Sequence, residues 1–130
     1  MAKRVLLDTH VVIDLGTPDG LGTIPPKVRR ILDDPEMDLL LSVVSEAEIA
    51  IKSQLGKLEL TAGDLARVCA GAAITPYPLR RLHTNRLFDL PFHHEDPFDR
   101  LIISTALSDG LPLISHDAQF RKYRGLRVIW

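Results

Sequence analysis

Residues 38–58, DLLLSVVSEAEIAIKSQLGKL, decide the fold because they place a strand immediately before a helix. The apolar run 38–44 predicts a buried strand, and the segment from Ser45 predicts a helix that ends at Gly56. The same alternation recurs outward from here: we expect strands at 4–8, 72–79, 111–115 and 126–130, and helical segments at 10–15, 26–34, 61–71, 80–90, 97–110 and 116–125. Parallel strands need crossover connections, so the sequence predicts a three-layer α/β/α sandwich with a central parallel sheet.

The composition indicates one domain over residues 1–130 without a strong overall charge. The chain has 16 lysines and arginines and 17 aspartates and glutamates, a net charge of −1 with histidine neutral. A polyanion such as a nucleic acid would therefore have to bind to a local group of positive side chains rather than to a protein of positive overall charge. The single cysteine, Cys69, excludes an internal disulfide and a multi-cysteine zinc site. Asp8 and Asp14 interrupt the N-terminal apolar run, which is therefore a poor signal peptide or membrane span. We expect a cytoplasmic protein whose main loop is the Gly/Pro-rich segment 16–26.

Four acids lie where the expected strands end. Ligands of parallel sheets bind beyond the carboxyl ends of the strands, where the following helices also begin. The four are Asp8 at the end of strand 4–8, Glu48 and Asp99 in the first turns of two helices, and Asp117 just after strand 111–115. We therefore expect these carboxylates to converge on one edge of the sheet.

Each of these acids also has a purely structural explanation. Ser45 with Glu48 matches a capping box, and Asp96, Pro97 and Asp99 match an N-cap, a first-turn proline and an acidic N3 residue. Asp117 could cap the turn that follows it, and Asp8 could be a loop residue that only satisfies backbone amides. Taken singly, each acid is explained better by such a structural role than by chemistry.

Position around the helix argues against capping alone for Glu48 and Asp99. Each shares a stripe with apolar residues: Val44, Ile51 and Leu55 in the first helix, and Ile102, Ile103 and Ala106 in the second. Both carboxylates are therefore expected to point toward the sheet edge. Glu46, two residues before Glu48, lies off the stripe and remains a rival.

Crowded, partly desolvated carboxylates predict a bound cation. Such groups repel and raise one another's pKa unless a positive charge joins them. An all-oxygen ligand set favours Mg²⁺ or Mn²⁺, and four acids leave room for two ions. His93 and His94 are adjacent in an irregular segment and are interpreted as rim or loop residues rather than as metal ligands.

Five stretches follow one another in order across nearly the whole chain: LLDTH at 6–10, EIAIKSQLGKLEL at 48–60, DPFDRLIISTAL at 96–107, LPLISHDAQF at 111–120 and VIW at 128–130. Together they resemble the PIN-domain ribonucleases, in particular VapC-like toxins of type II toxin–antitoxin systems. The segment 16–26 is longer and richer in glycine than is usual in that group.

The resemblance implies a metal-dependent endoribonuclease. Asp8, Glu48, Asp99 and Asp117 would be the catalytic acids that hold Mg²⁺ or Mn²⁺, and the reaction would be hydrolysis of an RNA phosphodiester. Ser115 matches a residue that supports the fourth acid, and Asp96 is an accompanying residue in the motif. The resemblance also implies a cognate antitoxin protein as partner and, commonly, a homodimer.

Two cations adjoin the acids and are candidates for RNA contacts. Lys52 lies one turn after Glu48, with an i,i+4 ion pair to that acid as its structural alternative. Arg100 follows Asp99 and is expected to face outward with Ser104 and Ser108, where it touches RNA or only solvent.

Other functions fit the sequence less well. A phosphoacceptor receiver domain has similar alternation but needs a lysine just after a late strand, and LPLISHD offers none. A dehalogenase-type phosphatase needs an acid where His10 stands, and a non-catalytic PIN module is expected to lack part of the acidic quartet. A PIN nuclease of RNA processing, rather than a toxin, stays open.

Overall fold

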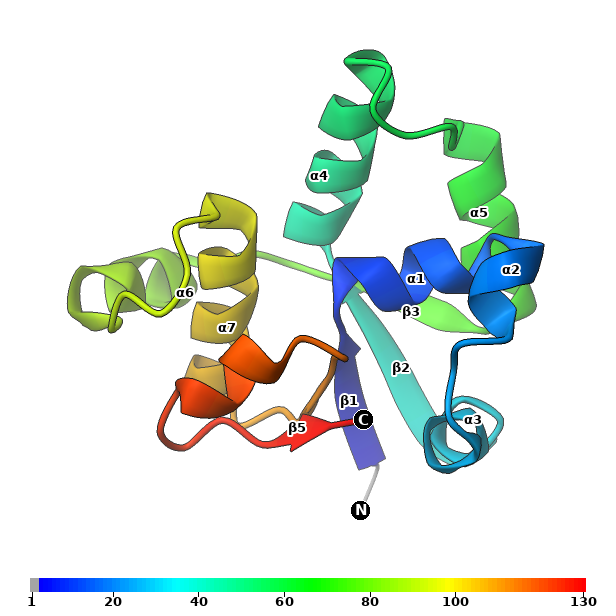
Figure 1. Cartoon of the computed structure of the whole chain (residues 1–130). Coiled ribbons are helices and arrows are strands. Elements are labelled where there is room, and N and C mark those ends of the chain that lie inside the picture. The colour runs from blue at the N-terminus through cyan, green and yellow to red at the C-terminus, as the bar shows by residue number, and fades with distance from the viewer. Residues whose placement is uncertain (1–2) are drawn as a thin grey trace.

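The computed structural model describes residues 3–130 and places five parallel strands at the centre of the molecule (Figure 1). The sheet has the order β3-β2-β1-β4-β5, and each neighbouring pair is parallel. The strands are β1 (Lys3–Leu7), β2 (Met37–Ser42), β3 (Ile74–Tyr77), β4 (Leu113–Ile114) and β5 (Val128–Ile129). The predicted three-layer α/β/α sandwich with a central parallel sheet is confirmed.

Helices connect these strands on both faces of the sheet. The α-helices are α1 (Thr9–Leu15), α2 (Pro18–Leu21), α3 (Pro26–Leu32), α4 (Val43–Gln54), α5 (Ala62–Gly71), α6 (Arg81–Arg86) and α7 (Pro97–Asp109). There are also two 3₁₀ helices in the described chain: η1 (Leu87–Asp89) lies between α6 and α7, and η2 (Ala118–Lys122) lies between β4 and β5. Within residues 3–130, no helix has the length and apolar character that crossing a membrane requires.

Successive side chains of the strands enter two different apolar cores, as the pleat of a sheet requires. Leu6 lies level with Leu40 of β2 and Leu113 of β4, and all three pack into the core on the side of α7 and η2. The next residues, Leu7 and Ile114, enter the opposite core, which α1, α3 and α5 cover. The central strands are therefore covered on both faces, whereas Thr75 and Pro76 of the edge strand β3 are exposed.

The boundary between β2 and α4 differs from the prediction. The strand ends at Ser42, whose hydroxyl accepts a hydrogen bond from the backbone N–H of Val44 at 3.0 Å and so caps the helix. The helix therefore begins two residues before Ser45, and the expected Ser45–Glu48 capping box is wrong. Ser42 and Ser45 are both good N-caps by residue type, so local preference did not distinguish them.

The Gly/Pro-rich segment 16–26, predicted to be a loop, is one only in part: it contains the short helix α2, which Thr17 caps by accepting a hydrogen bond from the backbone N–H of Gly20. Gly20 is needed there because a Cβ atom would lie 2.5 Å from the Cα of Asp14. The predicted end of α7 is confirmed: Gly110 adopts φ of +64°, a left-handed conformation that glycine accepts readily.

Candidate active site

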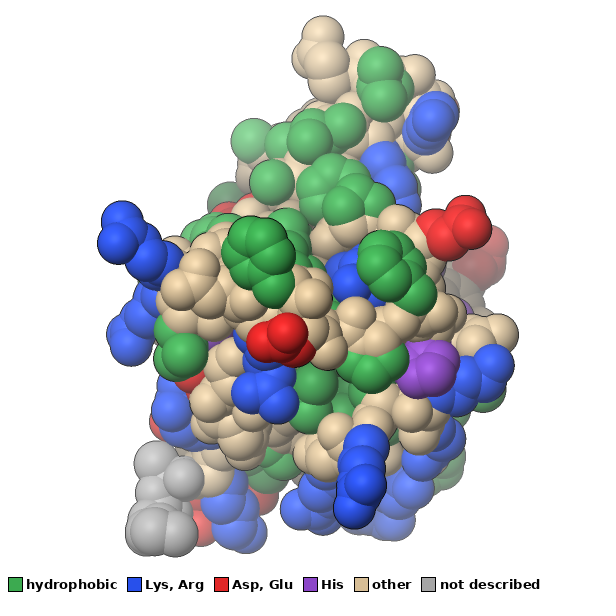
Figure 2. Space-filling view, turned by 90° about the vertical axis from the view of Figure 1, so that its left-hand side faces the viewer, with side chains coloured by type: hydrophobic (Ala, Val, Ile, Leu, Met, Phe, Trp, Pro, Cys, Tyr) green, Lys and Arg blue, Asp and Glu red, His purple; other side chains and the backbone are tan. Residues whose placement is uncertain are grey.

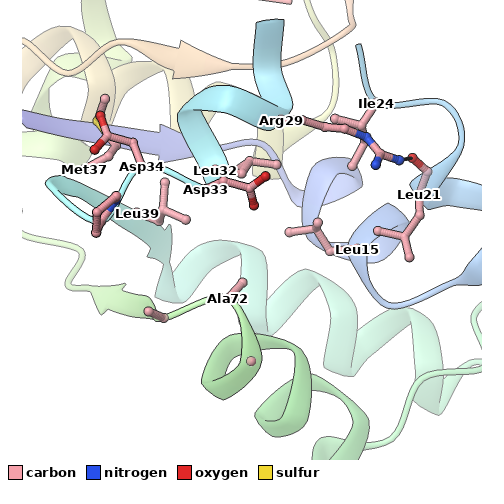
Figure 3. Close-up of a pocket in the computed structure, with 13 residues that line it drawn as sticks. Leu15, Leu21, Ile24, Arg29, Leu32, Asp33, Asp34, Met37, Leu39 and Ala72 are labelled. Atoms are coloured by element: carbon pink, nitrogen blue, oxygen red, sulfur yellow. Dashed lines mark hydrogen bonds between the residues drawn. The ribbon is translucent and has the colours of Figure 1, made fainter. Parts of the chain in front are cut away.

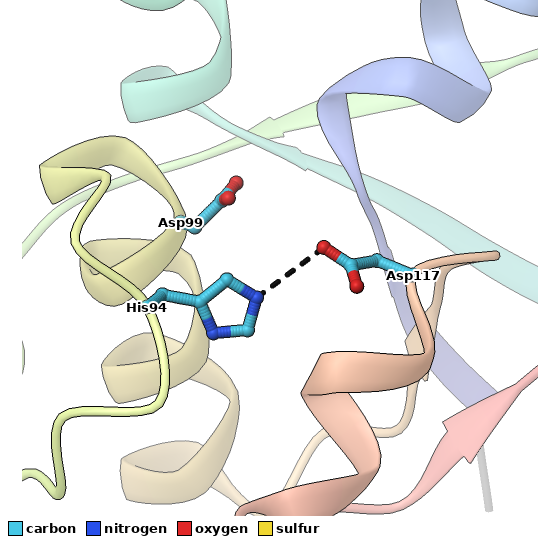
Figure 4. Close-up of side chains that lie close together, drawn as sticks. All are labelled: His94, Asp99 and Asp117. Carbon is cyan, nitrogen blue, oxygen red and sulfur yellow. Dashed lines mark hydrogen bonds and ion pairs between the residues drawn. The ribbon is translucent and has the colours of Figure 1, made fainter.

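The carboxyl ends of the central strands gather the four predicted acids. Asp8 follows β1, Glu48 lies in α4 directly after β2, and Asp117 lies beyond β4. Asp99 lies in the first turn of α7 and feels the charges of the other three. Figure 4 shows Asp99 and Asp117 projecting from α7 and from the start of η2 toward a shared space. The four acids were selected because ligands of parallel sheets bind beyond the carboxyl ends of the strands, and the structure brings them to that edge.

Asp8 is buried, and only one of its oxygens has a partner. Its Oδ2 accepts a hydrogen bond from the Ser115 hydroxyl at 2.8 Å, whereas Oδ1 is buried without a hydrogen-bond partner among residues 3–130. Burial raises the pKa of Asp8, against the lowering effects of Ser115 and His10. Ser115 also accepts from the backbone N–H of Asp117 at 3.1 Å, so this one hydroxyl holds two of the acids in position.

Glu48 is buried and has a partner at each oxygen. The Thr9 hydroxyl donates to Oε1 at 2.8 Å, and the Lys52 ammonium donates to Oε2 at 2.6 Å. This contact raises the pKa of Lys52. Thr9, which also lies 2.9 Å from the Ser45 hydroxyl, is a site residue that sequence reasoning missed, although it directly follows Asp8.

The predicted stripe around Glu48 is wrong in its distal half. Ile51 and Leu55 are 47% and 63% exposed, while Ser45 and Ile49 are buried beside Glu48. Figure 1 shows α4 rising away from the sheet, and its last turn contacts the segment before α5, where the Ser53 hydroxyl donates to the Leu60 carbonyl oxygen at 2.8 Å. Glu48 is buried because it is near the start of the helix.

Glu46, the rival acid, lies elsewhere. It is half-buried and lines a groove with Leu65 and Cys69 of α5, and its charge contributes to the raised pKa of the Cys69 thiol. Burial is the larger cause of that shift. Glu46 therefore faces α5 on the flank of α4, whereas Glu48 faces Thr9 and the acids.

Asp99 has a strongly raised pKa. Burial raises its pKa to about 7, with further contributions from Asp8, Asp96, Glu48 and Asp117. Its stripe partners Ile102, Ile103 and Ala106 are buried, as predicted. Its neighbour Asp96 caps α7 by accepting from the N–H of Phe98 at 2.8 Å, which confirms its predicted capping role.

The raised pKa of Asp99 predicts that the metal-free protein loses stability as the pH rises. The carboxyl titrates near 3.8 when unfolded but near about 7 when folded, so between these values the folded state binds more protons. The free energy of unfolding therefore falls with pH up to about 7. Asp99→Asn should raise the melting temperature in chelator at pH 8 and raise it less at pH 5. Thermal denaturation followed by circular dichroism checks this; an equal gain at both pH values would contradict it.

Asp117 has one oxygen in a cap and the other in the site. Its Oδ1 accepts from the N–H of Gln119 at 2.9 Å at the start of η2, and its Oδ2 lies 3.3 Å from the Nε2 atom of His94 (Figure 4). His94 lies in the irregular segment before α7, as predicted, but its side chain is only 8% exposed, so it is not a rim residue. His94, Asp99 and Asp117 each offer one ligand atom within 4.8 Å of the others.

Arg100 does not face outward. It is 7% exposed, and its guanidinium donates to the carbonyl oxygens of Leu90 and Pro91 at 3.1 and 2.9 Å and lies 3.8 Å from the centroid of the Phe92 ring. Ser104, expected beside it in solvent, is buried and donates to the His83 carbonyl. The segment before α7 turns its carbonyl groups toward the helix, and Arg100 is held inward because these groups need donors.

The chemistry of this cluster fits a divalent cation. Its donors are carboxylate oxygens, the buried Asp8 Oδ1 lacks a partner within residues 3–130, and burial together with the neighbouring negative charges raises the pKa of Asp99 to about 7. Among residues 3–130, Lys52 forms an ion pair with Glu48, and His94 lies 3.3 Å from Asp117. A hard cation such as Mg²⁺ or Mn²⁺ would satisfy these oxygens and relieve their repulsion.

A cavity of about 440 Å³ lies at the opposite, amino-terminal edge of the sheet (Figure 3). Apolar side chains such as Leu15, Leu32 and Leu39 form much of its lining. Arg29 also lines the cavity, and its guanidinium donates a hydrogen bond to the carbonyl oxygen of Leu21. None of the predicted site residues lines this cavity, so it takes no part in the candidate site.

The sequence matches the family model of the PIN domain over residues 5–126. The chain belongs to the PIN domain family. This is a nuclease family, and membership excludes the receiver-like and dehalogenase-like alternatives. No curated protein matches the sequence of this PIN domain.

Solved structures share the fold of this PIN domain at low sequence identity. A chain of DNA-bound VapBC from Salmonella typhimurium is 18% identical with a TM-score of 0.71, covering 99% of this chain and 98% of that one. A chain of VapBC2 from Rickettsia felis, bound to a promoter DNA fragment, is 13% identical with a TM-score of 0.70 and 97% coverage of both. A chain of a toxin–antitoxin complex from Klebsiella pneumoniae is 18% identical with a TM-score of 0.57, covering 97% and 96%.

Proposed function

We propose that the protein is a Mg²⁺- or Mn²⁺-dependent endoribonuclease that acts as the toxin of a type II toxin–antitoxin pair. The observation that carries the proposal is the group of four carboxylates at one sheet edge, in which the buried Asp8 Oδ1 has no partner among the described residues. A buried carboxylate oxygen in this state calls for a cation. Membership of a nuclease family then supports phosphodiester hydrolysis as the reaction.

Asp8, Glu48, Asp99 and Asp117 are the residues that would hold the metal. When bound, a divalent cation would acidify a water molecule and offset negative charge on the phosphate. The protein's own contribution is orientation: Ser115 fixes Asp8 and the backbone of Asp117, and Thr9 fixes Glu48. The side chains therefore need little rearrangement to receive the ion, which favours a preorganised site.

RNA must be drawn to an edge that is itself anionic. Lys52 is the best-placed cation, because its ammonium bonds to Glu48 while its side chain remains 36% exposed. Arg100 is unsuitable for this role, since its donors are engaged by the Leu90 and Pro91 carbonyls. We propose a single-stranded or looped RNA as substrate, because the bases of such RNA are accessible.

The proposed partners are a cognate antitoxin and a second copy of the chain. The Klebsiella structure of similar fold is a toxin–antitoxin complex, which supports an antitoxin partner here. Exposed apolar side chains supply surfaces for protein contacts: Val43, Ile51 and Leu55 on α4, and Leu82, Phe88 and Phe92 on and after α6. Figure 2 shows apolar side chains beside lysines and arginines on the face that includes α6.

Removal of the divalent cation is expected to abolish RNA cleavage. Purified protein should cut RNA with Mg²⁺ or Mn²⁺ and lose this activity in excess chelator, and activity should return when the cation is restored in excess. The products are separated on a denaturing gel, with RNA and metal alone as the control. Cleavage that is equally fast in chelator would overturn the metal-dependent mechanism.

A PIN nuclease of RNA processing is the second candidate function, since family membership alone does not separate it from a toxin. Expression of the chain in bacteria without an antitoxin distinguishes the two. A toxin arrests growth, and an inactive quartet variant relieves the arrest. Normal growth with intact, active protein would favour RNA processing.

A further inference from the structure

His94 occupies a fixed position beside the acids. The residue lies in the segment between η1 and α7, and its ring stacks on Tyr123 with centroids 5.5 Å apart and planes 19° apart. Phe120 meets the same ring edge-on at 4.6 Å. Two buried aromatic side chains therefore hold the imidazole in one orientation.

The two ring nitrogens of His94 have different environments. Nδ1 lies 3.1 Å from the hydroxyl of Tyr123, a normal hydrogen bond, whereas Nε2 lies 3.3 Å from Asp117 Oδ2, a long one. Nε2 points into the space that Asp99 and Asp117 share (Figure 4). A histidine that ligates a metal typically gives its other ring N–H to an orienting acceptor. The Tyr123 oxygen is placed to be that acceptor.

Few positive groups serve the acids around His94. Within residues 3–130, Lys52 is the one lysine or arginine that forms an ion pair with the four acids; it bonds to Glu48 at 2.6 Å, and its charge also acts on Asp99. Asp8 Oδ1 is buried without a partner among the described residues. His94, Asp99 and Asp117 bring one nitrogen and two oxygen donors within 4.8 Å of one another. An imidazole nitrogen thus adjoins two of the carboxylates proposed to hold the metal.

We propose that Nε2 of His94 is a metal ligand, which together with Asp99 and Asp117 gives this site a mixed nitrogen and oxygen donor set. The proposal rests on the metal-binding role assigned to the acids above. A nitrogen donor favours Mn²⁺ and Co²⁺ over Mg²⁺ more strongly than an all-oxygen site does. The ion preference of this nuclease would therefore be set by a residue outside its four acids.

The test compares the full chain with two variants and uses Mn²⁺ itself as the probe. His94→Gln keeps an amide that can bond to Asp117 but removes the imidazole, and His93→Ala removes the adjacent, exposed histidine as the matched control. Pulsed electron paramagnetic resonance of the Mn²⁺-loaded protein detects a directly bound nitrogen. Titration with Mn²⁺ and Mg²⁺ gives the affinities, and circular dichroism confirms that each variant folds.

We expect a nitrogen coupling in the unmodified chain and in His93→Ala that disappears in His94→Gln. Mn²⁺ affinity should fall by about tenfold or more in His94→Gln, with a smaller fall for Mg²⁺. Bound Mn²⁺ without a nitrogen coupling, or a coupling that persists in His94→Gln, would overturn the proposal while leaving the acidic metal site intact. Failure of the unmodified chain to bind Mn²⁺ would overturn the proposed function as well.

Discussion

Asp99→Asn should reduce RNA cleavage by more than about a hundredfold. Mutation of a residue that only orients a metal ligand typically costs roughly 10- to 100-fold in metal affinity or activity. Asp99 is proposed as a ligand itself, so a larger loss is expected. It lies at the centre of the cluster, where Asp8, Glu48 and Asp117 all act on its charge. Asparagine has almost the same size and removes the negative charge. Initial rates of cleavage at saturating Mg²⁺ measure the effect.

Asp96→Asn is the matched control for Asp99→Asn. Both residues lie at the start of α7, but Asp96 serves as the N-cap, and asparagine caps a helix about as well as aspartate. Asp96→Asn should therefore reduce the rate of RNA cleavage by less than about tenfold. Equal losses in the two variants would show that general charge at this helix end, rather than a carboxylate ligand at Asp99, supports catalysis.

Glu48→Gln should have a comparably large effect, of more than about a hundredfold on the cleavage rate. The substitution removes the charge that Lys52 neutralises and the carboxylate to which Thr9 donates. Lys52 would then be left beside the cluster without its partner and could occupy the space of the cation. Cleavage rates across a Mg²⁺ titration measure both the loss of rate and any loss of metal affinity.

Glu46→Gln provides the control on the same helix. Glu46 faces α5 beside Leu65 and Cys69, so its replacement should change the cleavage rate by less than about threefold, within the range of a surface substitution. A large loss in Glu46→Gln with a small one in Glu48→Gln would exchange the roles assigned to these two acids. Retained helicity in both variants excludes unfolding as the cause.

Local sequence signals predicted the ends of a helix well where only one nearby residue was a suitable cap. Asp96 before Pro97 and Gly110 at the end fixed both ends of α7. The start of α4 was missed because Ser42 and Ser45 offer equivalent caps. Tertiary contact decided between them, since Ser45 packs against the Thr9 hydroxyl instead.

The acids of the site were predictable because topology alone brings strand ends together. Contacts between loops were not predictable from the sequence. His94 meets Asp117 across 23 residues and Tyr123 across 29, and neither distance has a periodic signal in the sequence. Arg100 was misplaced for the same reason: the carbonyl groups that hold it lie in a segment whose path depends on the packed structure.

The hydrogen bond between Ser115 and Asp8 has a consequence for biosynthesis. These residues are 107 positions apart, and Asp117 lies beyond both. At about 5–20 residues per second, ribosomes take roughly 5–20 s to extend the chain from the first acid to the last. A nascent or prematurely terminated chain therefore lacks the complete cluster. If the acids are catalytic, the ribosome that makes this protein is exposed to its activity only after residue 117 has been translated.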